Sequence, residues 1–167
     1  EIEQRARETA AYSFDTIYFG GGTPSLLSPA LTGRIIQAVK SAFSDAACDR
    51  EITIECNPED FHPDRMRAYH EEGFNRVVLG LQTLDEDLRG VIGRRGKTPG
   101  DDMLDAFFAT DGMVHCVDLI AGIPGQTREG LAHELKRVLE YRPEHVSAYL
   151  LSVEKGTPLE KRLAPTG

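Results

Sequence analysis

Two carboxylates stand inside runs of otherwise apolar residues. Glu55 closes the segment 51–55, which reads EITIE, and Asp118 stands between a valine and a leucine. A carboxylate taken out of water is costly unless it is paired or bound to a ligand. Both positions therefore favour a functional carboxylate, and a structural salt bridge to Arg94 or Arg95 is the competing interpretation for each.

A run of three glycines, Gly20 to Gly22, leads into Thr23 and Pro24. Because glycine has no side chain, its backbone can approach a ligand closely. The same run also suits a tight turn, and the pattern alone favours neither interpretation.

The cysteines and histidines give no metal-binding pattern. Cys48, Cys56 and Cys116 are widely spaced, and neither CxxC nor CxxxCxxC occurs. We therefore expect three free thiols in a reducing compartment. The histidines, for which we expect surface or packing roles, are His62, His70, His115, His133 and His145. The segment 93–98 ends like a phosphate-binding loop, but Val91 stands where that motif needs glycine, which argues against nucleotide hydrolysis.

Five short apolar runs predict the strands that would position these groups. They are near-continuous rather than alternating, which is typical of strands buried on both faces. The runs cover residues 16–19, 52–56, 77–81, 114–120 and 146–151.

Helical patterns separate the strands. Ser28 before Pro29 marks a helix start. In the helix that follows, an apolar stripe recurs at every fourth position, at Leu31, Ile35, Val39 and Phe43. Further helices are expected at 64–72, 85–92, 101–111 and 131–139.

Strands and helices alternate at intervals close to the roughly 30 residues of a β-helix-β unit. This order predicts an α/β fold with a parallel sheet, either a barrel or an open doubly wound sheet. In both, ligands bind at the carboxyl ends of the strands. The glycine run, Glu55, Gln82 and Asp118 all lie at such ends, so we expect a ligand site on that rim.

Composition excludes some functions and suggests a larger parent. The 167 residues carry a net charge of −8, which would repel a nucleic-acid backbone. No apolar run reaches the roughly 18 residues of a membrane span. The chain opens with Glu1 and a polar, helix-prone segment, so we expect an internal segment of a longer cytoplasmic protein, with all 167 residues in one domain.

Several motifs, in order along nearly the whole chain, resemble those of radical S-adenosylmethionine (SAM) proteins of the HemW and oxygen-independent coproporphyrinogen III oxidase group. The matching segments are YFGGGTPS at 18–25, ECNP at 55–58, GFNRV at 73–77, DLIAGIPGQT at 118–127 and HVSAY at 145–149. Gly93-Arg94 and EKGTP at 154–158 look more like HemW than the oxidase.

The resemblance implies a partial parallel (β/α)6 barrel that here lacks its first β/α unit and a C-terminal domain. It implies SAM and a 4Fe-4S cluster as cofactors, and heme or porphyrin as a further ligand of the parent. The implied function is the SAM-binding core of a HemW-like heme chaperone. A true oxidase that decarboxylates coproporphyrinogen III and a plain α/β barrel acting on a small anion are the alternatives, and whether the parent is an enzyme stays open.

The resemblance also assigns roles to residues, all of them toward SAM. Gly21, Gly22 and Thr23 would line the methionyl group, and Glu55 would hydrogen-bond SAM. The remaining assignments are Gln82 and Arg94 on its polar parts, Asp118 on the ribose hydroxyls or amine, and a backbone contact of Ser152 on the adenine side.

Two departures from the family pattern stand out. The cluster-binding CxxxCxxC is absent, so no residue here is assigned to the metal and none to catalysis. Ala121 replaces a tyrosine common in relatives, and residues 98–111 diverge.

Overall fold

The computed structural model describes residues 1–8, 14–43, 50–94, 96 and 98–163. Five strands form one parallel sheet in the order β1-β2-β3-β4-β5. They are β1 (Thr16–Phe19), β2 (Glu51–Cys56), β3 (Arg76–Gln82), β4 (Val114–Ala121) and β5 (His145–Leu150). Each predicted strand is confirmed, with ends that shift by at most one residue, because buried apolar runs leave little freedom in assignment.

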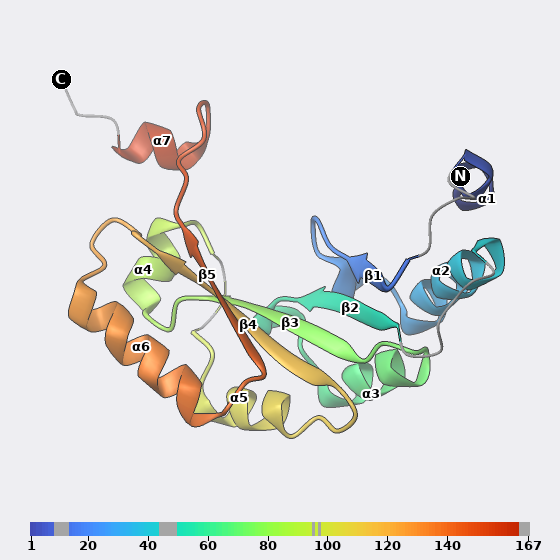
Figure 1. Ribbon diagram of the computed structural model, residues 1–167. Helices are drawn as coiled ribbons and strands as arrows, with labels where there is room; N and C mark the ends of the chain where they lie inside the picture. Colours follow the sequence, from blue (N-terminus) through green and yellow to red (C-terminus); the bar gives the residue numbers. More distant parts are fainter. Residues whose placement is uncertain (9–13, 44–49, 95, 97, 164–167) are drawn as a thin grey trace.

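The sheet curves into a half-barrel with helices along its convex side (Figure 1). The helices on that side are α2 (Pro29–Ala42), α3 (Pro63–Glu71), α5 (Asp101–Phe108) and α6 (Arg128–Glu140). The sequential strand order and the one-sided helices confirm the partial barrel. An open doubly wound sheet would reverse its order and carry helices on both faces.

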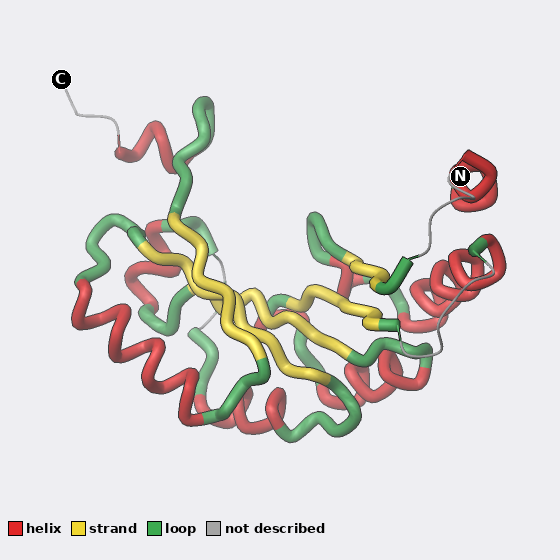
Figure 2. Tube along the Cα trace, in the orientation of Figure 1, coloured by secondary structure: helices red, strands yellow, loops and turns green. Residues whose placement is uncertain are grey.

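Shorter helices complete the described chain (Figure 2). They are α1 (Ile2–Glu8), α4 (Glu86–Val91), α7 (Pro158–Leu163) and the 3₁₀ turns η1 (Pro24–Leu26) and η2 (Pro58–Asp60). No helix within the described ranges is long and apolar enough to cross a membrane.

The hydrophobic core lies between the sheet and the helices on its convex side. Ile54, Leu79 and Val117 project from the three central strands and are fully buried. They pack in one cluster with Phe74 and Phe107. Each such side chain contributes on the order of 1.5–3 kcal/mol by leaving water, so this layer fixes the strands from which the polar groups of the other face project.

The buried face of α2 is centred on other residues than the expected apolar stripe. Leu31 is 40% exposed, whereas Ile36 is fully buried together with Thr32 and Gly33. A Cβ on Gly33 would lie 1.7 Å from a carboxylate oxygen of Glu72. The missing side chain lets the end of α3 come close to α2, which rotates the buried face toward Gly33.

The expectation that every strand is buried on both faces is also wrong. Tyr18 in β1 and Tyr149 in β5 are each 56% exposed. Both project from the concave face, which the described helices leave uncovered (Figure 1). The sheet therefore presents an open, polar inner face beside the carboxyl ends of its strands.

Candidate functional site

A cavity of about 110 Å³ lies at the carboxyl ends of β1 to β4. We call it the rim pocket. Its lining is Gly22, Thr23, Pro24, Glu55, Cys56, Asn57, Val78, Gly80, Gln82, Arg94 and Asp118. Six of the eight residues assigned from the resemblance thus line one cavity, although they come from five separate parts of the chain.

The other two assigned residues lie outside the lining. Gly21 belongs to the adjoining turn, where Gly21 and Gly22 have φ angles of +80° and +49°. Such angles favour glycine, and a Cβ at either position would meet nothing within 4 Å. The segment therefore forms a turn, and it also leaves its backbone open. Ser152 is exposed beyond the end of β5.

Glu55 is held by a tyrosine rather than by an arginine. The Tyr18 hydroxyl donates to Oε1 of Glu55 over 2.8 Å. A Cβ on Gly20 would lie 2.7 Å from the Tyr18 ring and 3.0 Å from Glu55 Oε1, so glycine at position 20 makes this contact sterically possible. The salt bridge to Arg94 does not form, and Arg95 lies outside the described residues.

Asp118 lies on the same side of the sheet as Glu55 and is poorly satisfied. Its Oδ1 is buried without a hydrogen-bond partner among the described residues. Burial raises the pKa of Asp118, a hydrogen bond from Ser147 opposes that rise, and the nearby Glu55 charge adds to it. A buried acceptor without a donor is a group that a ligand can satisfy.

Gln82 has a strained backbone at the end of β3. Its φ is +67°, in the left-handed region that non-glycine residues rarely adopt. The pairing of β3 with β4 shifts register between Leu79 and Gln82. Such irregularities re-aim side chains next to functional sites, and here Gln82 lines the rim pocket.

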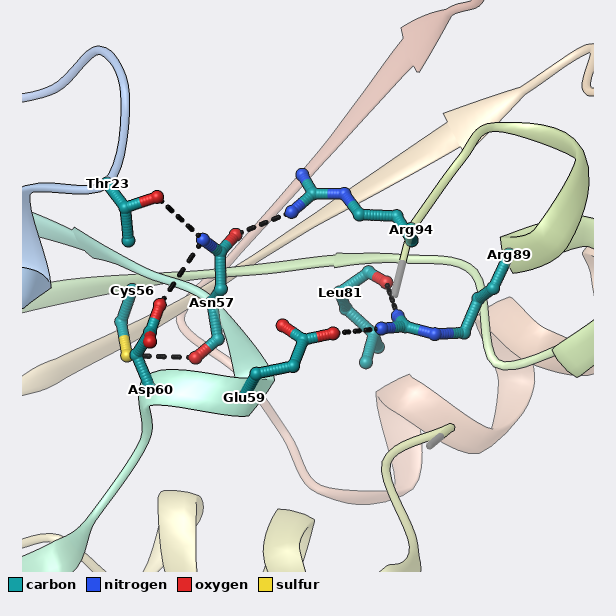
Figure 3. Close-up of polar contacts among 8 residues, drawn as sticks. All are labelled: Thr23, Cys56, Asn57, Glu59, Asp60, Leu81, Arg89 and Arg94. Atoms are coloured by element: carbon teal, nitrogen blue, oxygen red, sulfur yellow. Dashed lines mark hydrogen bonds and ion pairs between the residues drawn. The ribbon is translucent and has the colours of Figure 1, made fainter. Parts of the chain in front are cut away.

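Asn57 joins three parts of the pocket wall (Figure 3). Arg94 donates to its Oδ1 over 2.7 Å, and its Nδ2 donates to Thr23 Oγ1 over 3.1 Å. A longer contact of 3.5 Å reaches Asp60. The amide thus connects the loop after β1, the end of β2 and the loop after α4.

A buried ion pair stabilises the same wall of the rim pocket. Arg89 in α4 is 2% exposed and pairs with Glu59 of η2. Its Nη1 also donates to the backbone oxygen of Leu81 over 3.2 Å (Figure 3). Because a buried guanidinium needs such partners, this pair ties α4 and η2 to the end of β3, near Arg94.

The two cysteines that the structure describes, Cys56 and Cys116, are free and buried. Cys56 packs in the core, whereas Cys116 is paired in register with Val78, which in turn pairs with Glu55. The two thiols therefore project from opposite faces of the sheet, and Cys48 falls outside the described residues. Among the described residues, no three His, Cys, Asp or Glu side chains are grouped so that they could hold a metal ion.

Sequence reasoning missed Tyr18 and Asn57 as members of the site. Both stand inside motifs that carry the resemblance, yet their partners are 34 to 37 residues away in the chain. Only the strand-end position of Asn57, two residues after Glu55, was a usable signal. The ring of Tyr18 reaches Glu55 because the sheet pairs Tyr18 with Thr53.

The lining of the pocket combines two kinds of polar group. Glu55 and Asp118 offer acceptors and negative charge, whereas Arg94 offers donors and positive charge. A ligand with a cationic group and a carboxylate a few bonds apart would match both kinds. An amino-acid zwitterion has this arrangement.

Comparisons with known proteins show the family to which the chain belongs. The Radical SAM superfamily profile matches residues 1–138. Heme chaperone HemW of Mycobacterium tuberculosis is 34% identical over 165 residues, which are 98% of this chain and 42% of that protein. Radical S-adenosyl methionine domain-containing protein 1, mitochondrial, of Bos taurus is 34% identical over 161 residues, 95% of this chain and 36% of its own length.

Proteins named coproporphyrinogen III oxidase are also similar to this chain. Coproporphyrinogen III oxidase, anaerobic 1, of Cereibacter sphaeroides is 34% identical over 135 residues, 80% of this chain and 29% of that protein. Among solved structures, coproporphyrinogen III oxidase (HemN) from Escherichia coli superposes with a TM-score of 0.75 at 28% identity, covering 90% of this chain and 36% of its own. The chain therefore spans less than half the length of these relatives.

Proposed function

Because the chain belongs to the radical SAM superfamily, we propose that its rim pocket binds SAM and that the chain is the SAM-binding core of a HemW-like protein of heme metabolism. What carries the proposal is the gathering of Gly22, Thr23, Glu55, Gln82, Arg94 and Asp118 around one cavity. The match to the family excludes the plain α/β barrel as a separate class.

The groups of the pocket fit the groups of SAM. Asp118 has a buried oxygen without a partner among the described residues, and it accepts from the amine or from the ribose hydroxyls. Glu55 accepts from the amine as well. Arg94 and Gln82 face the polar end of the ligand, where a guanidinium pairs well with a carboxylate. The backbone of Gly21 and Gly22 lies open beside them.

The size of the pocket limits what it encloses. Pockets that surround a whole small-molecule ligand measure roughly 300–1,000 Å³, whereas the rim pocket holds about 110 Å³. We therefore assign only the methionyl end of SAM to it. The nucleoside would extend over the open concave face toward β5, with Ser152 at its far side.

The family uses a 4Fe-4S cluster that cleaves SAM reductively when it is bound. The described residues do not fit that cluster, because none of their side chains are grouped for metal binding. We assign no residue here to the cluster and no step to it. The contribution of this chain is to bind SAM and orient it.

Heme handling and a cytoplasmic location are proposed for the whole protein and not for this chain alone. Relatives named heme chaperone HemW and relatives named coproporphyrinogen III oxidase both match most of this chain. We favour the chaperone because Gly93-Arg94 and the segment EKGTP at 154–158 resemble HemW more than the oxidase. No described group is assigned to heme.

Calorimetric titration with SAM tests the proposed function. We expect one binding event for each chain, and weaker binding of S-adenosylhomocysteine, since that molecule keeps the amine but lacks the sulfonium charge, which reduces its attraction to the carboxylates of Glu55 and Asp118. A chain that binds neither ligand would contradict the proposed function.

A further inference from the structure

We infer that Asn57 is a positioning residue that makes the Thr23–Arg94 side of the rim pocket a surface of hydrogen-bond donors, specific for the ligand's carboxylate. The inference rests on the proposed function for the identity of the ligand. Its structural part concerns only the three side chains.

The chemistry of the partners fixes the orientation of the Asn57 amide. A guanidinium has only donors, so Arg94 must face the amide oxygen, as it does at 2.7 Å. The amide nitrogen then faces Thr23 Oγ1 at 3.1 Å and Asp60 at 3.5 Å, both of which can accept. A flipped amide would place donor against donor at Arg94.

This orientation decides what Thr23 can do. Its oxygen accepts from Asn57, and its own hydrogen has no acceptor among the described residues. Thr23 lines the pocket, where its hydroxyl can donate to a ligand. Arg94 uses Nη1 on Asn57, and its other guanidinium donors have no acceptor among the described residues. Both residues therefore reach the ligand as donors.

The backbone around Asn57 holds it in this place. Its carbonyl accepts from the amide of Asp60 over 3.0 Å at the start of η2. A Cβ on Gly80 would lie 3.3 Å from Asn57 Oδ1, tighter than an ordinary contact. The glycine thus leaves the space in which the amide stands between Thr23 and Arg94.

The two carboxylates of the pocket lining have the reverse character. Glu55 and Asp118 are acceptors, so the acceptors and the donors together orient a zwitterion with its carboxylate toward Thr23 and Arg94. Removing Asn57 should leave the two acceptors intact and release only the donors. The loss should therefore fall on the carboxylate and spare the rest of the ligand.

Decarboxylated SAM isolates this effect, because it keeps the amine and the sulfonium and lacks only the carboxylate. The experiment compares its affinity with that of SAM in the wild-type chain, in Asn57→Ala and in Asp64→Asn, a control at an exposed carboxylate at the start of α3. We expect the wild type to prefer SAM by roughly tenfold or more, the loss of one charge-assisted interaction. Asn57→Ala should abolish most of that preference, and Asp64→Asn should retain it.

A second arm needs no ligand. In nitrogen-15 NMR spectra the Arg94 guanidinium should give resolved side-chain signals in the wild type, which Asn57→Ala should lose while the sheet signals remain. An unchanged preference for SAM, or equal loss of both ligands, would overturn the role in recognition. Unchanged Arg94 signals would overturn the positioning itself. A wild type that binds no SAM but loses the Arg94 signals on substitution would overturn the proposed function alone.

Discussion

The Tyr18 hydroxyl lies 2.8 Å from Oε1 of Glu55 and joins the outermost strand, β1, to its neighbour β2 at the edge of the rim pocket. The contact depends on Gly20, whose missing Cβ leaves room for the ring. It is the one hydrogen bond to the Glu55 side chain that the described residues provide.

Tyr18→Phe should weaken SAM binding by about threefold to tenfold, since an exposed hydrogen bond to a charged group contributes on the order of 1 kcal/mol. Calorimetry in parallel with Tyr141→Phe, a tyrosine at the carboxyl end of α6 that stacks on Phe108, provides the control. In a Glu55→Gln background the Tyr18 effect should shrink, because the two residues act together. Equal effects in both backgrounds would show that Tyr18 acts independently of Glu55.

Asp118→Asn should stabilise the ligand-free chain and weaken SAM binding. Burial raises the pKa of Asp118 in the folded chain above the unfolded value of about 3.9. The protonated Asp118 side chain therefore contributes its full share to the stability of the fold below the unfolded pKa, and this share is lost as pH rises through the folded pKa. At neutral pH the ionised side chain destabilises the fold. Asparagine does not ionise.

Thermal melts and SAM titrations at neutral pH measure both effects. The melting temperature should rise, and SAM affinity should fall by roughly tenfold to a hundredfold through loss of a charge-assisted hydrogen bond. A variant that keeps the wild-type affinity would make Asp118 a structural residue.

A feature of this molecule can be predicted from the sequence when the residues that determine it lie close together along the chain. Strand order could be predicted, since each apolar run and each helix start, such as Ser28 accepting from the Leu31 amide, is local. The buried face of α2 could not, because it depends on Glu72 of another element meeting Gly33.

The same distinction applies to the rim pocket. Glu55 and Asp118 stand out as carboxylates in apolar strands, and strand ends of a parallel sheet share one rim. Asn57 and Tyr18 reveal their roles only through partners far along the chain. The competing salt bridge to Arg94 was wrong for Glu55, because Arg94 bonds to Asn57 instead.

His115 should make the fold sensitive to mild acid. It is 7% exposed against Phe107 and Phe108, and its Nε2 has no partner in the described part of the chain. Burial lowers its pKa, although the nearby Glu144 carboxylate opposes this shift. The neutral His115 side chain contributes its full share to the stability of the fold above the unfolded pKa of about 6.5. This share is lost as pH falls from there through the lower pKa of the folded chain.

Urea unfolding at pH 8 and pH 5.5 tests this prediction. The wild type should lose more stability between the two pH values than His115→Gln does. His62→Gln, at an exposed histidine in the turn before α3, should behave like the wild type. A His115→Gln variant with the full wild-type pH dependence would show that other groups are responsible.

Reconstituted anaerobically with iron and sulfide, the 167-residue chain should not assemble a stoichiometric 4Fe-4S cluster. Such clusters need several thiolates close together, and Cys56 and Cys116 project from opposite faces of the sheet. Iron and sulfide analysis with low-temperature EPR after dithionite reduction measures the result. A reduced-cluster signal that Cys56→Ala abolishes would contradict the prediction.

A crystal structure of the chain with SAM tests the central claim most directly. A second cavity, of about 520 Å³, lies between α3 and α5 and is lined in part by Arg67 and His70, so the rim pocket is not the larger of the two. We predict that the methionyl group occupies the rim pocket, with its carboxylate near Thr23 and Arg94 and its amine near Glu55 and Asp118. SAM bound between α3 and α5, or in the rim pocket with its carboxylate toward Asp118, would contradict this account.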